Sequence, residues 1–316
     1  MIALNGLLAG SFYGVSQAEY DALMAFYVAT DGPNWTNNTG WGVDPNVAAW
    51  YGVTVAGGVV TRLDLSSNAL AGDIGITIYD LTSITVINVN SNAITDGDFS
   101  QNILLTQPWF ASNSFTAFDF STNTLISNVS LGGNPLTSNP DFTNNTAITT
   151  LRIANSDLTA LDLSALVNIT ILQCHENTSL GTLSSTNNVL LTLVDCHSCG
   201  LSALDTSTNS LLQTLVAYSN AITAFDFSAN FAARNFSIQN NGMSEAEVDA
   251  TLLSIYTNRA SYTYATPVLD ISGTNAAPSG TLQYSAAPST GKEYIYALMN
   301  DDDAEGFNLW NITYTA

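Results

Sequence analysis

The sequence predicts a strand-rich α/β fold, a right-handed solenoid of about nine to ten repeats of 21–24 residues with a helical cap at each end. The repeat is clearest between residues 191 and 230, where four positions recur 21 residues apart: Val194, Cys196, Cys199 and Leu201, then Leu215, Ala217, Asn220 and Ile222. A fixed period near 20 residues with the pattern L-x-L-x-x-N-x-L is typical of stacked coils that each contribute one short strand.

The same column of positions runs through most of the chain. From Asn68 to Asn241 the asparagine-type position recurs every 21 or 22 residues, after a first step of 24. The two apolar residues before it lie two apart, so they are expected to point inward from a short strand. The asparagine follows where the chain turns, and its side chain can bond the exposed backbone of neighbouring coils. Ser156 and Cys199 replace it in two coils, and Pro108 predicts a weak strand.

A second column of short segments suggests a second narrow sheet or 3₁₀-type turns. Its segments read FDFSTN (118–123), PDFTNN (140–145), LDLSAL (161–166), LDTSTN (204–209) and FDFSAN (225–230). Their aspartates are expected to point outward in one row: Asp119, Asp141, Asp162, Asp205 and Asp226. Two interpretations stay open, because the mutual repulsion could be relieved by salt screening with local hydrogen bonds or by weakly bound Ca²⁺ or Mg²⁺. No other cofactor is expected.

Helix signals flank the repeats. Ser16 with Glu19, and Ser244 with Glu247, are capping boxes that begin helices. The residues after 290 predict a last helix and a closing strand. We therefore expect an N-terminal arm at 1–15, a helical cap at 16–59, repeats at 60–241 and a C-terminal cap at 242–316. The arm is apolar and uncharged, so it is expected to attach the chain to its own larger assembly.

The charge balance excludes two classes of partner. The chain has 26 acidic and 5 basic residues, a net charge of −21. Nucleic acids and anionic lipid surfaces both require clustered Lys and Arg. No apolar stretch reaches about 18 residues, so membrane insertion is not expected. The first basic residue is Arg62, so residues 1–15 lack the positive start of a secretory signal, although a surface of Ser, Thr and Asn looks extracellular.

The cysteines and histidines cluster in the middle of the array but do not predict a zinc site. Strand alternation points Cys174 and Cys196 inward and His175 and His197 outward, so the DCHSC motif cannot converge on one ion. Buried free thiols are the favoured interpretation. With only two histidines on a repeated surface, a nucleophile–His–carboxylate arrangement is not indicated, and we expect no enzyme.

The outward face of the first column is the predicted ligand-binding surface. Most of its side chains are small and polar, and the bulky or charged exceptions are Trp109, Arg152, His175, His197 and Tyr218. Aromatic rings beside amide and hydroxyl groups suit a carbohydrate or a flat protein epitope. The alternative is an ordinary solvated sheet face.

Residues 21–70 resemble the N-terminal cap of leucine-rich repeat proteins, which is a short helix followed by GPNWTNNTGW, WYGVT and LDLSSN. In plant members cysteines flank the WYGVT segment, whereas Ala49 and Val55 stand here. We therefore expect the cap to be held by packing of four aromatic residues: Trp35, Trp41, Trp50 and Tyr51. The double column of the repeats resembles the bacterial and bacteriophage type.

This resemblance implies a non-enzymatic recognition or adhesion module on a virus particle, a bacteriophage tail or fibre protein that binds a host surface protein or glycan. It implies an extracellular location on the virion surface. The alternative is a secreted or surface-attached bacterial leucine-rich repeat adhesin or filament subunit.

Overall fold

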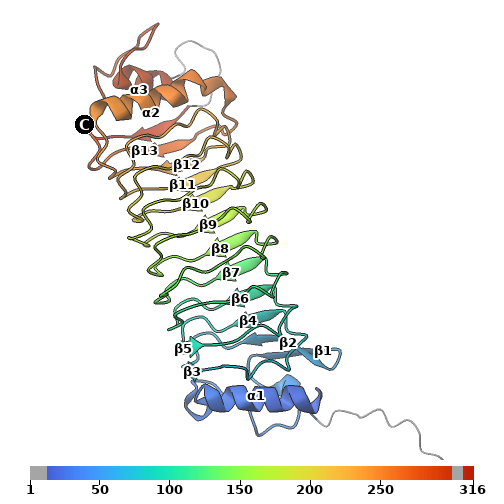
Figure 1. Cartoon of the computed structure of the whole chain (residues 1–316). Helices are drawn as coiled ribbons and strands as arrows, with labels where there is room; N and C mark the ends of the chain where they lie inside the picture. Colours follow the sequence, from blue (N-terminus) through green and yellow to red (C-terminus); the bar gives the residue numbers. More distant parts are fainter. Residues whose placement is uncertain (1–12, 301–308) are drawn as a thin grey trace, which may run out of the picture. The chain divides into compact units, whose positions relative to one another are not determined.

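The computed structural model describes residues 13–300 and 309–316. The chain divides into two compact units, residues 1–147 and 148–316, and short strands stack side by side in each of them (Figure 1). The predicted N-terminal arm lies outside the described residues except for Tyr13, Gly14 and Val15. Val15 is fully buried, and the ring of Tyr13 stacks on Tyr20 at 3.8 Å. No helix in the described ranges is both long and apolar enough to cross a bilayer.

The first unit begins with one helix and continues as strands. Its elements are α1 (Gln17–Ala29), the 3₁₀ turns η1 (Gly32–Asn34) and η2 (Val47–Ala49), β1 (Val53–Ala56), β2 (Val59–Asp64), β3 (Ala71–Asp73), β4 (Val86–Asn88), β5 (Ala93–Asp96), β6 (Gln107–Trp109) and β7 (Asn128–Ser130). β1 pairs antiparallel with β2, after which β2, β4, β6 and β7 run parallel. β6 and β7 share the single pair Trp109–Ser130, as expected beside Pro108, which has no N–H to donate.

Helix α1 starts at the predicted capping box and is joined to the sheet by the same glutamate. Glu19 accepts from the backbone N–H of Ser16 at 3.1 Å, and its other oxygen accepts from the N–H of Val60 at 2.8 Å. The buried helix face consists of Glu19, Ala22, Leu23 and Phe26. Tyr20, Met24 and Tyr27 of the same helix are half-buried.

Three tryptophans hold the N-terminal cap. Trp35, Trp41 and Trp50 are at most 5% exposed. Each indole N–H donates to a backbone carbonyl, at 2.8 to 2.9 Å. Tyr51, the fourth residue predicted to pack there, is 40% exposed, so that part of the prediction is wrong. Its carbonyl, rather than its ring, serves the cap by accepting from Trp41.

The second unit is a parallel stack that ends in two helices. Its elements are β8 (Thr150–Arg152), β9 (Ile171–Gln173), β10 (Leu193–Asp195), β11 (Thr214–Val216), β12 (Asn235–Ser237), α2 (Glu245–Thr257), η3 (Arg259–Ser261), β13 (Val268–Asp270), α3 (Gly291–Met299) and β14 (Asn311–Thr313). The strands pair in register, with Leu172, Val194 and Leu215 side by side and buried. The capping box at Ser244 and Glu247 begins α2 as predicted, and α2 and α3 lie together at the end of this stack (Figure 1).

The predicted asparagine column is confirmed. Asn177 shows the pattern, because its amide donates to the carbonyls of Ile153 and Cys174 at 2.9 and 2.7 Å. Its Oδ1 accepts from the N–H groups of Ser156 and Leu158 at 2.9 and 3.1 Å. One side chain thus bonds the backbone of its own coil and of the preceding coil.

The second column is not a second narrow sheet. Within the described ranges, the one sheet besides the main one is the pair β3 and β5 in the first unit, which lies outside the five segments of this column. The segments at 118–123, 140–145, 161–166, 204–209 and 225–230 are turns without a strand, each closed by a backbone hydrogen bond between residues three apart, such as the Leu166 N–H to the Leu163 carbonyl at 2.9 Å. The alternative of 3₁₀-type turns is therefore the correct one. Side chains bond further backbone groups of these turns: each aspartate accepts from the N–H two residues later, and buried asparagines donate to the carbonyls.

Candidate functional site

Two rows of side chains cover the outward face of the second unit. The register of β8 to β11 aligns Arg152, Gln173, Asp195 and Val216, which we call the strand row. Two residues further along three successive coils stand His175, His197 and Tyr218, which we call the ring row. Alternation along each strand puts both rows on the face opposite the buried Leu172, Cys174 and Cys196.

The ring row is a continuous stack. The rings of His175 and His197 lie 4.4 Å apart at an interplanar angle of 10°, and those of His197 and Tyr218 lie 4.4 Å apart at 16°. Neighbouring strands are spaced by about 4.8 Å, so planar side chains at the same place in successive coils meet face to face. Three of the five predicted ligand-binding residues therefore form one surface.

Polar contacts join the strand row to the ring row. Arg152 donates through Nε to Oε1 of Gln173 at 3.0 Å. Asp195 accepts from Nδ1 of His197 at 2.7 Å, and its second oxygen lies 4.0 Å from Nε2 of His175. Arg152 and the ring row thus belong to the same outward face, with Gln173 and Asp195 between them.

Trp109 lies in the first unit, in different surroundings. The guanidinium of Arg62 lies over its ring, 5.6 Å from the centroid. Arg62 also pairs with Asp64 at 2.6 Å, and Asn88 donates to that carboxylate at 2.8 Å. Trp109 therefore contributes to a separate charged and aromatic patch.

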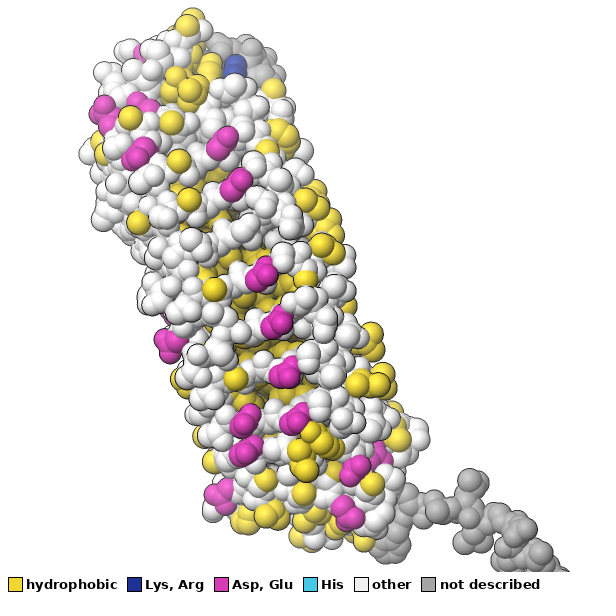
Figure 2. Space-filling model, viewed as in Figure 1, with side chains coloured by type: hydrophobic (Ala, Val, Ile, Leu, Met, Phe, Trp, Pro, Cys, Tyr) yellow, Lys and Arg dark blue, Asp and Glu magenta, His cyan; other side chains and the backbone are white. Residues whose placement is uncertain are grey.

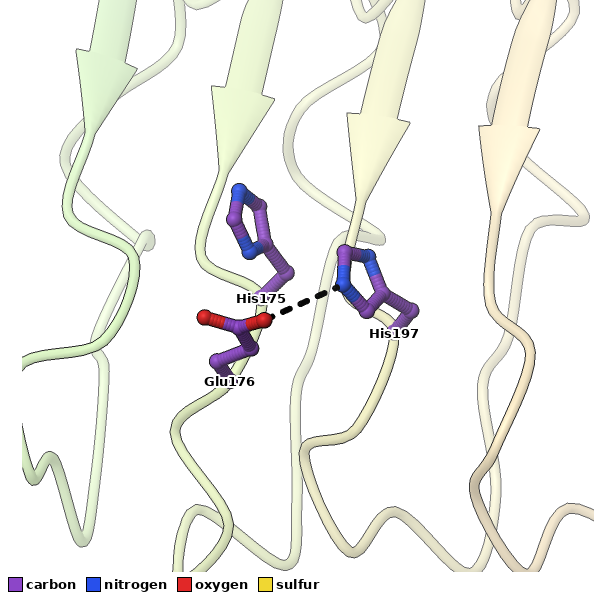
Figure 3. Close-up of side chains that lie close together, drawn as sticks. All are labelled: His175, Glu176 and His197. Carbon is purple, nitrogen blue, oxygen red and sulfur yellow. Dashed lines mark ion pairs between the residues drawn. The ribbon is translucent and has the colours of Figure 1, made fainter.

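Sequence reasoning missed Glu176. Its side chain is 54% exposed, and its Oε1 lies 4.0 Å from Nε2 of His197 (Figure 3). The backbone of Glu176 is left-handed, with φ at 61°, which turns the chain at the end of the strand. The available signal was the run His175-Glu176, one coil before His197, at a turn position that is Ser, Asn or Gly in the other coils.

The cysteines behave as predicted. Cys174, Cys196 and Cys199 are free thiols and fully buried, whereas His197 is partly exposed, so DCHSC does not converge on one ion. Burial raises the pKa of Cys196 well above its usual value, so this thiol stays protonated. Cys199 occupies an asparagine position and donates to the carbonyl of Cys174 at 3.1 Å.

The aspartates of the second column have local hydrogen-bond partners. Each accepts from the backbone N–H two residues later, at 2.8 to 2.9 Å: Asp119, Asp141, Asp162, Asp205 and Asp226. The Thr143 hydroxyl and N–H hold the pKa of Asp141 below its usual value, and the N–H and hydroxyl of Ser207 do the same for Asp205. These bonds support the interpretation without cations, and the Ca²⁺ or Mg²⁺ row remains a prediction.

Shallow hollows lie between these aspartates in the second unit. One, of about 540 Å³, has Leu161 and Leu183 among its lining residues, with Asp162 and Asp205. Another, of about 530 Å³, has Asp205, Asp226 and Phe225 on one side and Leu253 of α2 on the other. Figure 2 shows the recurring pattern of acidic side chains with apolar surface between them.

Comparison with known proteins identifies the fold. No protein-family model matches the sequence. The functional domain of InlJ from Listeria monocytogenes is similar at 26% identity, with a TM-score of 0.57 over 66% of this chain and 45% of that one. The leucine-rich repeat ectodomain of the receptor kinase GASSHO1/SCHENGEN3 from Arabidopsis thaliana matches at 19% identity, with a TM-score of 0.55 over 81% of this chain and 38% of that one.

A third structure, the Arabidopsis receptor kinase HAESA, matches at 14% identity, with a TM-score of 0.53 over 72% of this chain and 46% of that one. The chain thus spans less than half the length of each of these proteins. The stacked strands and the asparagine column, together with these similarities, show that the chain folds as a leucine-rich repeat solenoid.

Proposed function

We propose that this chain is a non-enzymatic recognition module that binds a host surface protein through the outward face of β8 to β11, as a bacteriophage tail or fibre protein. The observation that carries the proposal is the ring row, in which three aromatic side chains stack in successive coils beside Arg152 and Asp195. Rings already held in place lose little freedom on binding, so such a surface is preorganised.

The fold is compatible with this use. The HAESA structure was obtained in complex with a peptide hormone and a co-receptor, and the GASSHO1/SCHENGEN3 ectodomain in complex with CASPARIAN STRIP INTEGRITY FACTOR 2. Extended solenoids bind partners over several coils at once. A non-enzymatic role is supported by the two histidines of the sequence, which stack on each other rather than orienting a nucleophile.

The virus-particle assignment rests on the resemblance of the repeats to those of bacteriophage proteins and on a surface poor in charge, with 10% charged residues. A secreted or cell-surface bacterial adhesin or filament subunit is the competing assignment. Immunogold labelling of purified virus particles with an antibody against this chain separates them. Labelled tails or fibres support the proposal, and label confined to bacterial surfaces favours the adhesin.

The binding face is tested with Tyr218→Ala in the full chain. Loss of an aromatic anchor is expected to weaken binding to host cells about tenfold or more, with an unchanged melting temperature. The matched control is Tyr264→Ala, because Tyr264 is also exposed, at 39%, but contacts Arg234 outside the ring row.

Protease treatment of the host cells should abolish binding, and glycosidase treatment should leave it intact. The reverse result would make the partner a glycan. Equal binding by wild type and Tyr218→Ala would remove this face from consideration.

A further inference from the structure

We propose that His175, Glu176 and His197 bind one divalent transition-metal ion of the kind that imidazole ligands prefer, with Zn²⁺ as the natural probe. The three residues come from two neighbouring coils and lie together at the ends of β9 and β10 (Figure 3). The site goes beyond partner recognition, and it can be tested without a partner.

The spacing of the ligand atoms is close to what an ion requires. One nitrogen from each histidine and one oxygen of Glu176 all lie within 4.8 Å of one another. Around a tetrahedral ion with bonds of about 2.0 to 2.1 Å, ligand atoms stand roughly 3.4 Å apart. The cluster must close by up to about 1.4 Å, and Glu176 can supply much of this movement because its side chain is 54% exposed.

Asp195 fixes the tautomer of His197. A carboxylate only accepts hydrogen bonds, so the contact of 2.7 Å places the proton of the His197 ring on Nδ1. The lone pair is then on Nε2, which is the nitrogen that lies 4.0 Å from Glu176. A carboxylate behind a histidine in this way is the usual support of a metal ligand, and it raises the basicity of the coordinating nitrogen.

His175 has a buried nitrogen that no residue in the described part of the chain satisfies. Its Nδ1 has no hydrogen-bond partner, although buried polar atoms nearly always have one. A bound ion would satisfy a free nitrogen of this ring. The two rings are now nearly parallel, at 10°, so their lone pairs lie in separate planes. The ring of His175 must rotate to coordinate, while His197 keeps its contacts with Asp195 and Tyr218.

The backbone at Glu176 adds a separate observation. The equivalent turn residue is left-handed in ten described coils: Ser67, Ser91, Ser112, Gly133, Asn155, Glu176, Ser198, Ser219, Asn240 and Gly273. Small or amide residues are the ordinary choice for this conformation. Glu176 is the one glutamate in this set, and it lies beside the two histidines. A less favourable residue thus occupies a strained turn position where it can serve as a metal ligand.

Three protein ligands leave one coordination position open to solvent. Structural zinc sites are closed by four protein ligands, whereas an open fourth position accepts water or a group from another molecule. The buried thiols lie on the opposite side of the strands, so they do not complete the set.

The proposal is tested by isothermal titration of the full chain after removal of metals with a chelator. We expect about one Zn²⁺ per chain and no comparable heat with Mg²⁺, which prefers oxygen ligands. His175→Gln and His197→Gln should each weaken Zn²⁺ binding at least tenfold. Asp195→Asn should weaken it by about ten- to 100-fold, because it removes the support of His197.

Glu176→Gln should weaken binding, and Glu245→Gln, which makes the same change at an exposed glutamate elsewhere in the unit, should leave it unchanged. Metal-free melting temperatures show whether the variants are folded. If a variant unfolds, chemical shift changes of the two imidazoles of the wild type on adding Zn²⁺ provide the same test, and unchanged shifts of both rings would contradict the proposal.

Substitution with Co²⁺ identifies the ligands. A spectrum of nitrogen and oxygen ligation without a thiolate charge-transfer band is expected. A thiolate band, binding unaffected by either histidine variant, or Zn²⁺ binding no tighter than Mg²⁺ binding would each overturn the proposal. None of these outcomes touches recognition of a protein partner through Tyr218, so the two proposals fail separately.

Discussion

The two sides of each coil use buried asparagine differently. On the sheet side Asn177 makes four hydrogen bonds, two through its amide and two through its carbonyl oxygen. On the opposite side Asn188 donates to the carbonyls of Leu163 and Leu166, at 3.0 and 2.9 Å, and its Oδ1 has no partner. Both residues are almost fully buried in the same unit, so the difference comes from the backbone around them.

The difference shows how a coil distributes its N–H groups. At the sheet side, backbone N–H groups just after the strand have no backbone acceptor. They donate instead to the asparagine of the next coil, as Ser156 and Leu158 do to Asn177. At the opposite side the aspartates take such groups, as Asp162 does with the N–H of Ser164. The Oδ1 atoms of Asn102, Asn123 and Asn145 in the first unit also lack partners. The first-column Asn177 therefore links coils through both the donors and the acceptor of its amide, whereas the second-column Asn188 links them through its amide donors alone.

The largest expected effect comes from deleting one asparagine of each kind. Asn177→Ala leaves two buried N–H groups and two carbonyls unpaired and should cost about 4 kcal/mol of unfolding free energy. Asn188→Ala leaves only two carbonyls without a hydrogen-bond donor and should cost about 2 kcal/mol. Urea denaturation of both variants measures the difference. Equal losses would show that the two columns contribute alike.

A smaller effect is expected from Thr206→Val. Thr206 donates its hydroxyl to Oδ1 of Asn230 at 3.0 Å. The Oδ1 atom of Asn230 therefore has a partner, whereas the equivalent Oδ1 atom of Asn188 has none. The change keeps the shape of the side chain, and its expected cost is about 1 kcal/mol. Thr208→Val is the control, because Thr208 is exposed and donates to a carbonyl of the preceding coil. Its loss should be close to zero in the same assay.

Acid should weaken the side that relies on aspartate. The N–H and then the hydroxyl of Ser207 hold the pKa of Asp205 below its usual value. A carboxyl whose folded pKa is depressed stabilises the fold above its unfolded pKa, near 3.9, and this contribution disappears as pH falls through the folded pKa. In urea denaturation, Asp205→Asn should therefore differ more from wild type at about pH 6 than at about pH 2. A difference in unfolding free energy between the variant and wild type that is the same at both pH values contradicts this.

The smallest effect concerns cations on the same aspartates. Because each carboxylate already accepts an N–H, we expect CaCl₂ and NaCl of equal ionic strength to raise the melting temperature equally. The Ca²⁺ or Mg²⁺ interpretation instead requires an excess with calcium that Asp205→Asn combined with Asp226→Asn abolishes. Such an excess would establish the acidic row as a cation site.

The sequence alone was sufficient for the strands, the asparagine column and the starts of two helices. Periodicity fixes these features, because each coil must bury its apolar pair against the next and satisfy its backbone in the same way. Residue spacing therefore predicted the position of Asn177 and the helix starts at Ser16 and Ser244. The inward thiols and outward histidines followed from strand alternation.

Only the tertiary structure decided features that depend on where side chains turn. The sequence left the second column open between a narrow sheet and 3₁₀-type turns. The structure has turns, because the aspartates accept from N–H groups of their own turns, and local bonds of this kind compete with a sheet ladder. Glu176 lies beside His197 because its own backbone is left-handed and directs its side chain there. The amino-acid sequence does not reveal that dihedral angle. Spacing sets which coil a residue belongs to, whereas backbone dihedrals and rotamers set what its side chain contacts.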